Sequence, residues 1–179
     1  MVRKADFSPC GKFRYMLTRR WADGRPRAMC IGLNPSTADA ERDDPTIRIL
    51  IAYLNVMGYG GLLMCNLYAL ISSTPDKLWD VPNNQGDNDE WLKLAAKHSD
   101  TIIYCWGNFK GVEYRAHDVQ SLCPAGKCFG RTKSGAPIHP MALMYGGRKN
   151  WTYKLEEYNT HQPLTLLNMP RHDGQAIPE

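Results

Sequence analysis

The sequence predicts a single α/β domain built around a mostly parallel sheet of four or five strands. Short apolar runs typical of buried strands alternate along the chain with segments of helical apolar spacing. The 179 residues are enough for one domain with a substantial core, and hydrophobic residues make up 43% of them. We therefore expect one domain over residues 1–179, with a loose C-terminal tail from about residue 171.

The first two expected strands suggest an antiparallel hairpin at a sheet edge. Phe13–Arg19 alternates polar and apolar residues, Trp21–Pro26 forms a turn, and Arg27–Leu33 is the next strand. Five arginines gather in this region: Arg14, Arg19, Arg20, Arg25 and Arg27. They predict either a solvated basic edge or an edge that contacts phosphate.

A β-loop-α-β unit comes next. Asp44 suits the N-cap of a helix and Pro45 its first position. One apolar helix face is then predicted by the spacing of Ile47, Leu50, Ile51 and Leu54. Leu62–Cys65 is a continuous apolar run, hence a buried strand, and it ends at Asn66. Because the strands flanking the helix would be parallel, Asn34 and Asn66 are expected at the same sheet edge.

The second half of the chain continues the alternation. Residues 67–88 are mostly loop, with a short helical turn. The further elements expected are helices over Asp89–His98 and Gly111–Leu122, and strands over Thr101–Trp106 and Cys128–Thr132.

Charge and cysteines suggest a cytoplasmic protein. The net charge of +4 is compatible with a polyanionic partner but too small to identify one. The chain lacks a secretory signal and any apolar run long enough to cross a membrane, so no membrane partner is expected. Cysteines inside apolar runs act as small buried hydrophobes, and here they are Cys30, Cys65 and Cys105. The remaining three, Cys10, Cys123 and Cys128, have spacing unlike a zinc site, so we expect no metal and no other cofactor.

Four segments, in order, resemble motifs of the uracil-DNA glycosylase superfamily. Gly32-Leu33-Asn34-Pro35 resembles its first motif, and Leu62–Asn66 is similar to the strand whose terminal Asn reads the base. Ile103–Gly107 resembles its Leu-Trp-Gly strand, and Ile138-His139-Pro140 its His-Pro-Ser loop. The resemblance covers residues 29–140 and implies that superfamily's three-layer α/β/α fold.

A more specific resemblance is to a bacterial and bacteriophage family of unknown function. Its signature is the run Leu33-Asn34-Pro35-Ser36-Thr37-Ala38-Asp39, followed by Asp44-Pro45-Thr46 and Gly58-Tyr59-Gly60. This family supplies no activity, so the chemistry has to come from the site.

The glycosylase resemblance implies hydrolysis of the N-glycosidic bond of a natural or modified pyrimidine in DNA, by a monomer. Such a reaction needs a positioned water, a donor for the departing base anion, and groups that read the base. By resemblance, Asn34 positions the water and His139 stabilises the base oxygen. The substrate-binding residues it implies are Gly32, Leu33, Pro35, Ser36, Asn66, Tyr68, Trp106 and Pro140. The aromatic partner of the base stays open among Tyr68, Tyr104, Trp106 and Phe109.

The sequence departs from that superfamily in three places, one of which is Ser36-Thr37-Ala38-Asp39 in place of the usual continuation of the first motif. Asn34 stands where its most active members carry Asp, and Met141 stands where they carry Ser. Two carboxylates nearby, Asp39 and Asp43, leave two alternatives open. Either residue supplies the missing carboxylate for catalysis, or it only solvates the loop or caps a helix.

Three functions therefore compete. The first is a glycosidic hydrolase acting on DNA or a nucleotide with a pyrimidine base. The second is a binding module that recognises a nucleobase without turnover. The third is a nucleotide-modifying enzyme of phage base modification.

Overall fold

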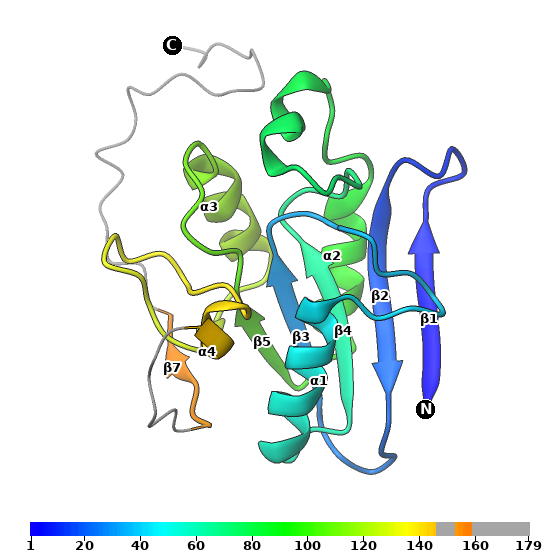
Figure 1. Ribbon diagram of the computed structural model, residues 1–179, viewed down its shortest axis with the longest axis vertical. Helices are drawn as coiled ribbons and strands as arrows, with labels where there is room; N and C mark the ends of the chain where they lie inside the picture. The colour runs from blue at the N-terminus through cyan, green and yellow to red at the C-terminus, as the bar shows by residue number, and fades with distance from the viewer. Residues whose placement is uncertain (146–152, 159–179) are drawn as a thin grey trace.

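A computed structural model describes residues 1–145 and 153–158 of the chain (Figure 1). The tail expected to be loose from residue 171 lies outside these residues. The elements in chain order are β1 (Val2–Phe7), β2 (Arg14–Arg20), β3 (Arg27–Gly32), α1 (Pro45–Val56), β4 (Gly61–Asn66), the 3-10 helix η1 (Pro75–Asp80), α2 (Asn88–Lys97), β5 (Thr101–Tyr104), α3 (Glu113–Leu122), β6 (Lys127–Cys128), α4 (Ala142–Tyr145) and β7 (Glu156–Glu157).

The described strands form one mixed sheet of seven strands in the order β1-β2-β4-β3-β5-β6-β7. Neighbours are parallel at β3–β4, β3–β5 and β5–β6, and antiparallel at β1–β2, β2–β4 and β6–β7. The prediction of a mostly parallel sheet of four or five strands, in a glycosylase-like three-layer fold, is therefore wrong. Half of the pairings are antiparallel, because β1 and β2 extend the parallel centre at one edge and β7 extends it at the other.

The predicted N-terminal hairpin is also wrong. β2 pairs with β4, where Leu17 lies opposite Met64, and not with β3. Its other neighbour is β1, a strand that the sequence analysis did not anticipate. This arrangement brings Arg14, at the start of β2, to the edge at which β3 and β4 end, because β2 runs antiparallel to both.

The helices bury their apolar residues on opposite faces of the sheet. Leu50 and Leu54 of α1 pack in one core cluster with Cys30 of β3. Leu92 of α2 and Val119 of α3 pack in the other, which also contains β3 and β4 side chains. Figure 1 shows α1 in front of the sheet, with α2 and α3 on the far side.

Local sequence signals account for α1. The side chain of Asp44 accepts a hydrogen bond from the backbone N–H of Ile47 at 2.9 Å, and Pro45 occupies the first turn. This cap satisfies one of the N–H groups that a helix leaves unpaired at its start. The prediction for this helix is confirmed.

The cysteines in apolar runs are core residues, as predicted. Cys30, Cys65 and Cys105 are each 0% exposed, and burial raises the pKa of the Cys65 thiol. All six cysteines are free. Among the described residues, no helix is both long enough and apolar enough to cross a membrane.

Candidate functional site

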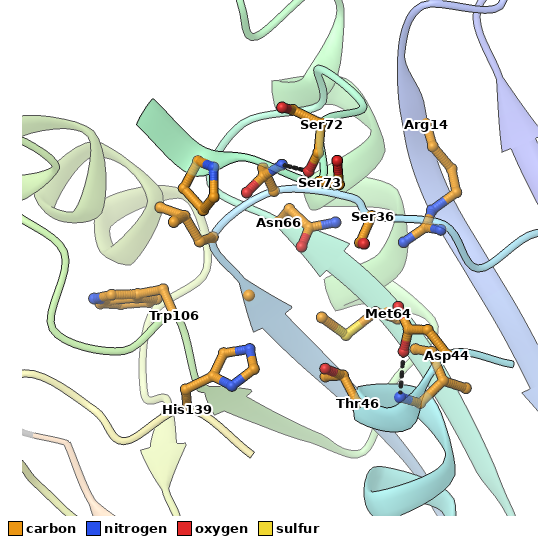
Figure 2. Close-up of a pocket in the computed structure, with 15 residues that line it drawn as sticks. Arg14, Ser36, Asp44, Thr46, Met64, Asn66, Ser72, Ser73, Trp106 and His139 are labelled. Carbon is orange, nitrogen blue, oxygen red and sulfur yellow. Dashed lines mark hydrogen bonds between the residues drawn. The ribbon is translucent and has the colours of Figure 1, made fainter. Parts of the chain in front are cut away.

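A pocket of about 260 Å³ opens where the parallel strands end (Figure 2). β3 and β4 run in parallel with Gly32 opposite Asn66, so their last residues meet at this edge, as predicted. Small-molecule pockets usually hold roughly 300–1,000 Å³, so this one suits a single small ligand. Seven of the ten predicted site residues line it: Gly32, Leu33, Asn34, Ser36, Asn66, Trp106 and His139.

The other three predicted residues are not among those that line the pocket. The carbonyl of Pro35 accepts a hydrogen bond from the backbone of Ser72 instead. Tyr68 is 4% exposed and packs edge-on against Trp79. Pro140 is buried beside His139.

Asn66 is the most unusual residue of the pocket. It is 2% exposed, and neither Oδ1 nor Nδ2 has a hydrogen-bond partner. A buried amide without partners is costly, because water solvates both groups in the unfolded chain. The backbone around it is well held, since the carbonyls of Asn66 and Leu67 accept hydrogen bonds from Asn88, and Leu67 also accepts one from Arg115. The backbone that carries this amide is therefore held in place, and the amide keeps its hydrogen-bonding capacity for a ligand.

Gly32 makes room for this amide. A Cβ at position 32 would lie 2.7 Å from Cε of Met64 and 2.9 Å from Oδ1 of Asn66. Both distances are shorter than normal contacts, so any side chain here would displace Asn66 or Met64. The role of Gly32 is thus steric. The group that faces the ligand is the amide of Asn66, which lies opposite Gly32 on β4.

Asn34 has one defined orientation. Its Nδ2 donates to the carbonyl oxygens of Ser72, at 2.8 Å, and of Pro35, at 3.0 Å. Because carbonyl oxygens only accept, the atom between them must be the amide nitrogen. Oδ1 is thereby left as an acceptor on a residue that lines the pocket. Such an acceptor can orient a water molecule.

His139 enters the pocket from the loop that follows Gly130. Its Nδ1 accepts a hydrogen bond from the backbone N–H of Met141 at 3.2 Å, which requires Nδ1 to be unprotonated. Burial lowers the pKa of His139, and the charge of Asp44 only partly opposes this effect. The imidazole is therefore neutral with its proton on Nε2, a donor for a ligand oxygen.

A glycine allows the histidine to sit this close to β5. Gly107 has a φ of +82°, and a Cβ there would lie 3.2 Å from Cβ of His139. Its N–H also bonds the carbonyl of Pro137 at 3.0 Å, which ties the two loops together.

The pKa of His139 predicts how the site responds to acid. We expect NMR titration of its ring protons to give a midpoint below 6.5, the ordinary value for histidine. An unfolded histidine binds its proton at a higher pH than this one, so the free energy of unfolding should fall as the pH drops through 6.5. His139→Gln should remove this part of the pH dependence. A midpoint at or above 6.5 would contradict the neutral assignment.

Of the four aromatic residues considered for the base, Trp106 is the one that lines the pocket. Its ring also packs on Tyr104, with centroids 5.0 Å apart, and meets Tyr158 edge-on. Tyr104 itself is 1% exposed. Phe109 stacks on Trp79 instead. Trp106 is therefore the aromatic wall available to a ligand.

Sequence reasoning missed several pocket residues, above all Arg14 and Asp44. Asp44 was expected only as a helix cap, and Arg14 only as one of five clustered arginines. These arginines do not act together: Arg19 and Arg20 pair with Asp43 and Asp23, whereas Arg14 lines the pocket. The remaining lining residues that were missed are Thr46, Ile47, Met64, Ser72, Ser73 and Pro75.

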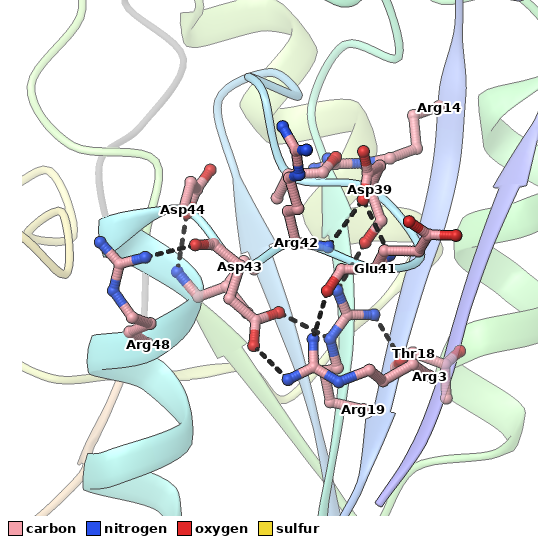
Figure 3. Close-up of polar contacts among 12 residues, drawn as sticks. Arg3, Arg14, Thr18, Arg19, Asp39, Glu41, Arg42, Asp43, Asp44 and Arg48 are labelled. Atoms are coloured by element: carbon pink, nitrogen blue, oxygen red, sulfur yellow. Dashed lines mark hydrogen bonds and ion pairs between the residues drawn. The ribbon is translucent and has the colours of Figure 1, made fainter.

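Asp39 and Asp43, the two carboxylates considered for catalysis, hold the loop together instead (Figure 3). Asp39 accepts hydrogen bonds from the backbone of Glu41 and Arg42, which lower the pKa of its carboxyl group. Asp43 pairs with Nε of Arg19 at 2.7 Å, and Nη2 of Arg3 lies 2.9 Å from its other oxygen. These contacts fix the loop that precedes α1.

Metal-ligating side chains do not converge at the pocket. In the described residues, no group of three or more His, Cys, Asp or Glu side chains is placed to hold a metal ion. Cys10 is exposed, whereas Cys123 and Cys128 are buried at separate places.

Comparison with known proteins adds a family to this geometry. The family described as "Protein of unknown function (DUF1643)" matches residues 14–141. The chain belongs to the DUF1643 family. Searches of the curated proteins and of the solved structures each found no match. Every pocket-lining residue, from Arg14 to His139, lies inside the DUF1643 match. The run Leu33–Asp39 lies inside it as well, whereas β1 precedes it.

Proposed function

We propose that this DUF1643 protein hydrolyses the N-glycosidic bond of a natural or modified pyrimidine in DNA. One observation carries the proposal: the Asn66 amide is buried, unpaired and part of a pocket that Asn34 and His139 share. A site that leaves both a donor and an acceptor unpaired rejects ligands that cannot satisfy them.

The Asn66 amide suits the edge of a pyrimidine base. Its Nδ2 donates and its Oδ1 accepts, so it pairs with a neighbouring acceptor and donor on one base edge. A base in a DNA duplex reaches such a pocket only after it is extruded from the stack. The ring of Trp106 then forms one wall of the base site.

His139 and Asn34 act on the bond itself. As the C1′–N bond breaks, its electron pair leaves with the base, and Nε2–H of His139 donates to the base oxygen that gains charge. The sugar becomes oxocarbenium-like and is attacked by a water that Oδ1 of Asn34 orients. The water oxygen bonds C1′, and the proton it releases neutralises the base.

The motif resemblance to uracil-DNA glycosylases supports this assignment for the site, not for the fold. Asn34, Asn66 and His139 belong to three separate motif segments, and all three line one pocket.

A non-catalytic binding module is the second candidate, and one observation favours it. Asn34 cannot remove a proton, and Asp44, a carboxylate that lines the pocket, already caps α1 with one oxygen. General-base catalysis contributes roughly 10²- to 10⁴-fold, so turnover without it is expected to be slow.

An excision assay tests the proposal. Single- and double-stranded oligonucleotides carrying uracil, hydroxymethylated pyrimidines or mismatched thymine are incubated with the protein, and abasic sites are counted. We expect abasic sites with the parent, and a loss of about 10²-fold or more in Asn34→Ala and His139→Ala.

Two matched variants serve as controls. Asn55→Ala removes an exposed amide of α1, and His117→Ala removes an exposed imidazole of α3; neither residue lines the pocket. Both should excise like the parent. Salt-dependent binding without abasic sites would favour the binding module, and excision that survives Asn34→Ala would refute the assignment of the site.

The cytoplasm is the location that we propose. The six cysteines are free, and five of them are buried, which suits a reducing compartment.

A further inference from the structure

The reaction proposed above does not use Arg14. This residue is 3% exposed, its Nη1 donates to the carbonyl of Ala38, and its Nε is buried without a partner. Burial lowers the pKa of Arg14 to about 10, so the guanidinium still carries its charge at neutral pH.

The other buried arginines of the described chain have partners. Arg19 is 0% exposed and pairs with Asp43; Arg115 is 5% exposed and pairs with Asp89. Among the described residues, no carboxylate makes an ion pair with Arg14. A buried charge is costly unless an anion pairs with it. Arg14 is thus the buried arginine for which the described residues provide no anionic partner.

Asp44 does not fill that role. Of the neighbouring charges, it raises the pKa of Arg14 most, but it forms no ion pair with Arg14 in the described residues. Its Oδ1 is bound to the N–H of Ile47, at the positive end of the α1 dipole. The charge of Asp44 is therefore partly offset by α1, and Asp44 leaves Arg14 without a direct ion pair.

Arg14 lies at the end of the pocket opposite Trp106 (Figure 2). In this view Ser36 lies between Asn66 and Arg14. A ligand whose base meets Asn66 thus presents its other end to Ser36 and Arg14.

We propose that Arg14 and Ser36 form a phosphate subsite, so that the pocket binds a pyrimidine joined to its sugar and phosphate. The planar guanidinium matches two phosphate oxygens, and the Ser36 hydroxyl supplies a further donor. This inference rests on the proposed function only in placing the base at Asn66. The phosphate belongs either to a free nucleotide or to the adjoining phosphodiester of a DNA strand.

Calorimetric titration with matched ligands tests the subsite. The ligands are deoxyuridine, deoxyuridine 5′-monophosphate, and a trinucleotide with a central deoxyuridine, together with the corresponding deoxycytidine series. We expect a phosphate-bearing ligand to bind roughly 10- to 100-fold more tightly than its nucleoside, the range of charge-assisted hydrogen bonds. Preference for the monophosphate identifies a free nucleotide, and preference for the trinucleotide identifies a strand.

Arg14→Gln should lower the affinity for the phosphate-bearing ligand until it equals the affinity for the nucleoside. Arg14→Lys, which keeps the charge without the planar fork, should retain part of the preference. The control Arg25→Gln, which removes an exposed arginine away from the pocket, should bind all ligands like the parent.

Equal affinity for nucleoside and phosphate-bearing ligands would overturn the subsite. An Arg14→Gln variant that weakens binding of nucleosides and phosphate-bearing ligands by the same factor would overturn it as well. Such a uniform loss would mean that Arg14 acts through its hydrogen bond to Ala38, which supports the pocket for every ligand. Failure of every ligand to bind at millimolar concentration would overturn it too. Failure of the proposed function is different: phosphate preference persists, but no abasic sites depend on Asn34.

Discussion

Replacing Asn66 with leucine should stabilise the free protein while abolishing recognition of the base. Each unsatisfied buried polar group costs about 1–3 kcal/mol, and leucine has neither of the two that Asn66 leaves unpaired. We expect the free energy of unfolding to rise by about 1–2 kcal/mol after allowing for imperfect packing of leucine beside Gly32. Thermal denaturation and the excision assay measure the two effects.

Asn88→Leu is the matched control for this variant. Asn88 is also a buried asparagine, but its Nδ2 bonds the carbonyls of Asn66 and Leu67 at 2.8 and 3.1 Å. Its loss takes the side-chain donor from the carbonyl of Asn66 and leaves the carbonyl of Leu67 with Arg115 alone, while Asn88 itself has only one unpaired group, Oδ1, so this variant should be less stable than Asn66→Leu. If Asn66→Leu is destabilised to the same degree, the amide of Asn66 is not free, and its assignment as the base reader is wrong.

Replacing Asp43 with alanine should cause the largest loss of stability. Asp43 pairs with Arg19, which is 0% exposed, and removing one partner of a buried ion pair costs about 3–5 kcal/mol. For a chain of this size that corresponds to a melting temperature lower by roughly 10 °C. Chemical denaturation of the variant measures the change.

Asp23→Ala provides the comparison. Asp23 pairs with Arg20 at 2.6 Å, but its side chain is 95% exposed, and such surface pairs contribute about 0–1 kcal/mol. A second variant, Arg19→Met with Asp43→Leu, removes both charges and should regain much of the stability. A loss in Asp43→Ala as small as that in Asp23→Ala would show that this ion pair does not hold the loop before α1.

The parts of the fold that were predicted correctly depend on local sequence. α1 carries its own start signal in Asp44 and Pro45, and its apolar spacing identifies the buried face. β4 is a continuous apolar run in which every residue is buried, so its identity did not depend on knowing its partners. That Asn34 and Asn66 lie at one edge then followed from the parallel pairing of β3, which ends just before Asn34, and β4, which ends at Asn66.

Strand partners could not be predicted in the same way. The alternation in β2 shows that one face is buried, but it does not say which strand lies alongside. A hairpin with β3 needs only a short loop, yet β2 pairs with β4, which comes after α1. β3 lies instead between β4 and β5, with a parallel pairing on each side. The balance of parallel and antiparallel pairs was wrong because β1 and β7, two strands that were not predicted, each add an antiparallel pairing.

The missed half of the pocket has the same cause. Arg14 reaches the site because β2 lies directly beside β4, with its start at the end of β4, and no local pattern reveals which strand β2 pairs with. Asp44 was predicted to cap α1, and it does. Its proximity to Arg14 and His139 depends on the tertiary fold.

The close approach of Gly32 and Asn66 sets a rule for how related sequences can vary. The space for a Cβ at position 32 is already taken by the Asn66 amide and the end of Met64. A relative with alanine or serine at position 32 must therefore shift the ends of both side chains or carry smaller residues at positions 64 and 66. Substitutions at these three positions should accordingly be coupled among sequences of the family.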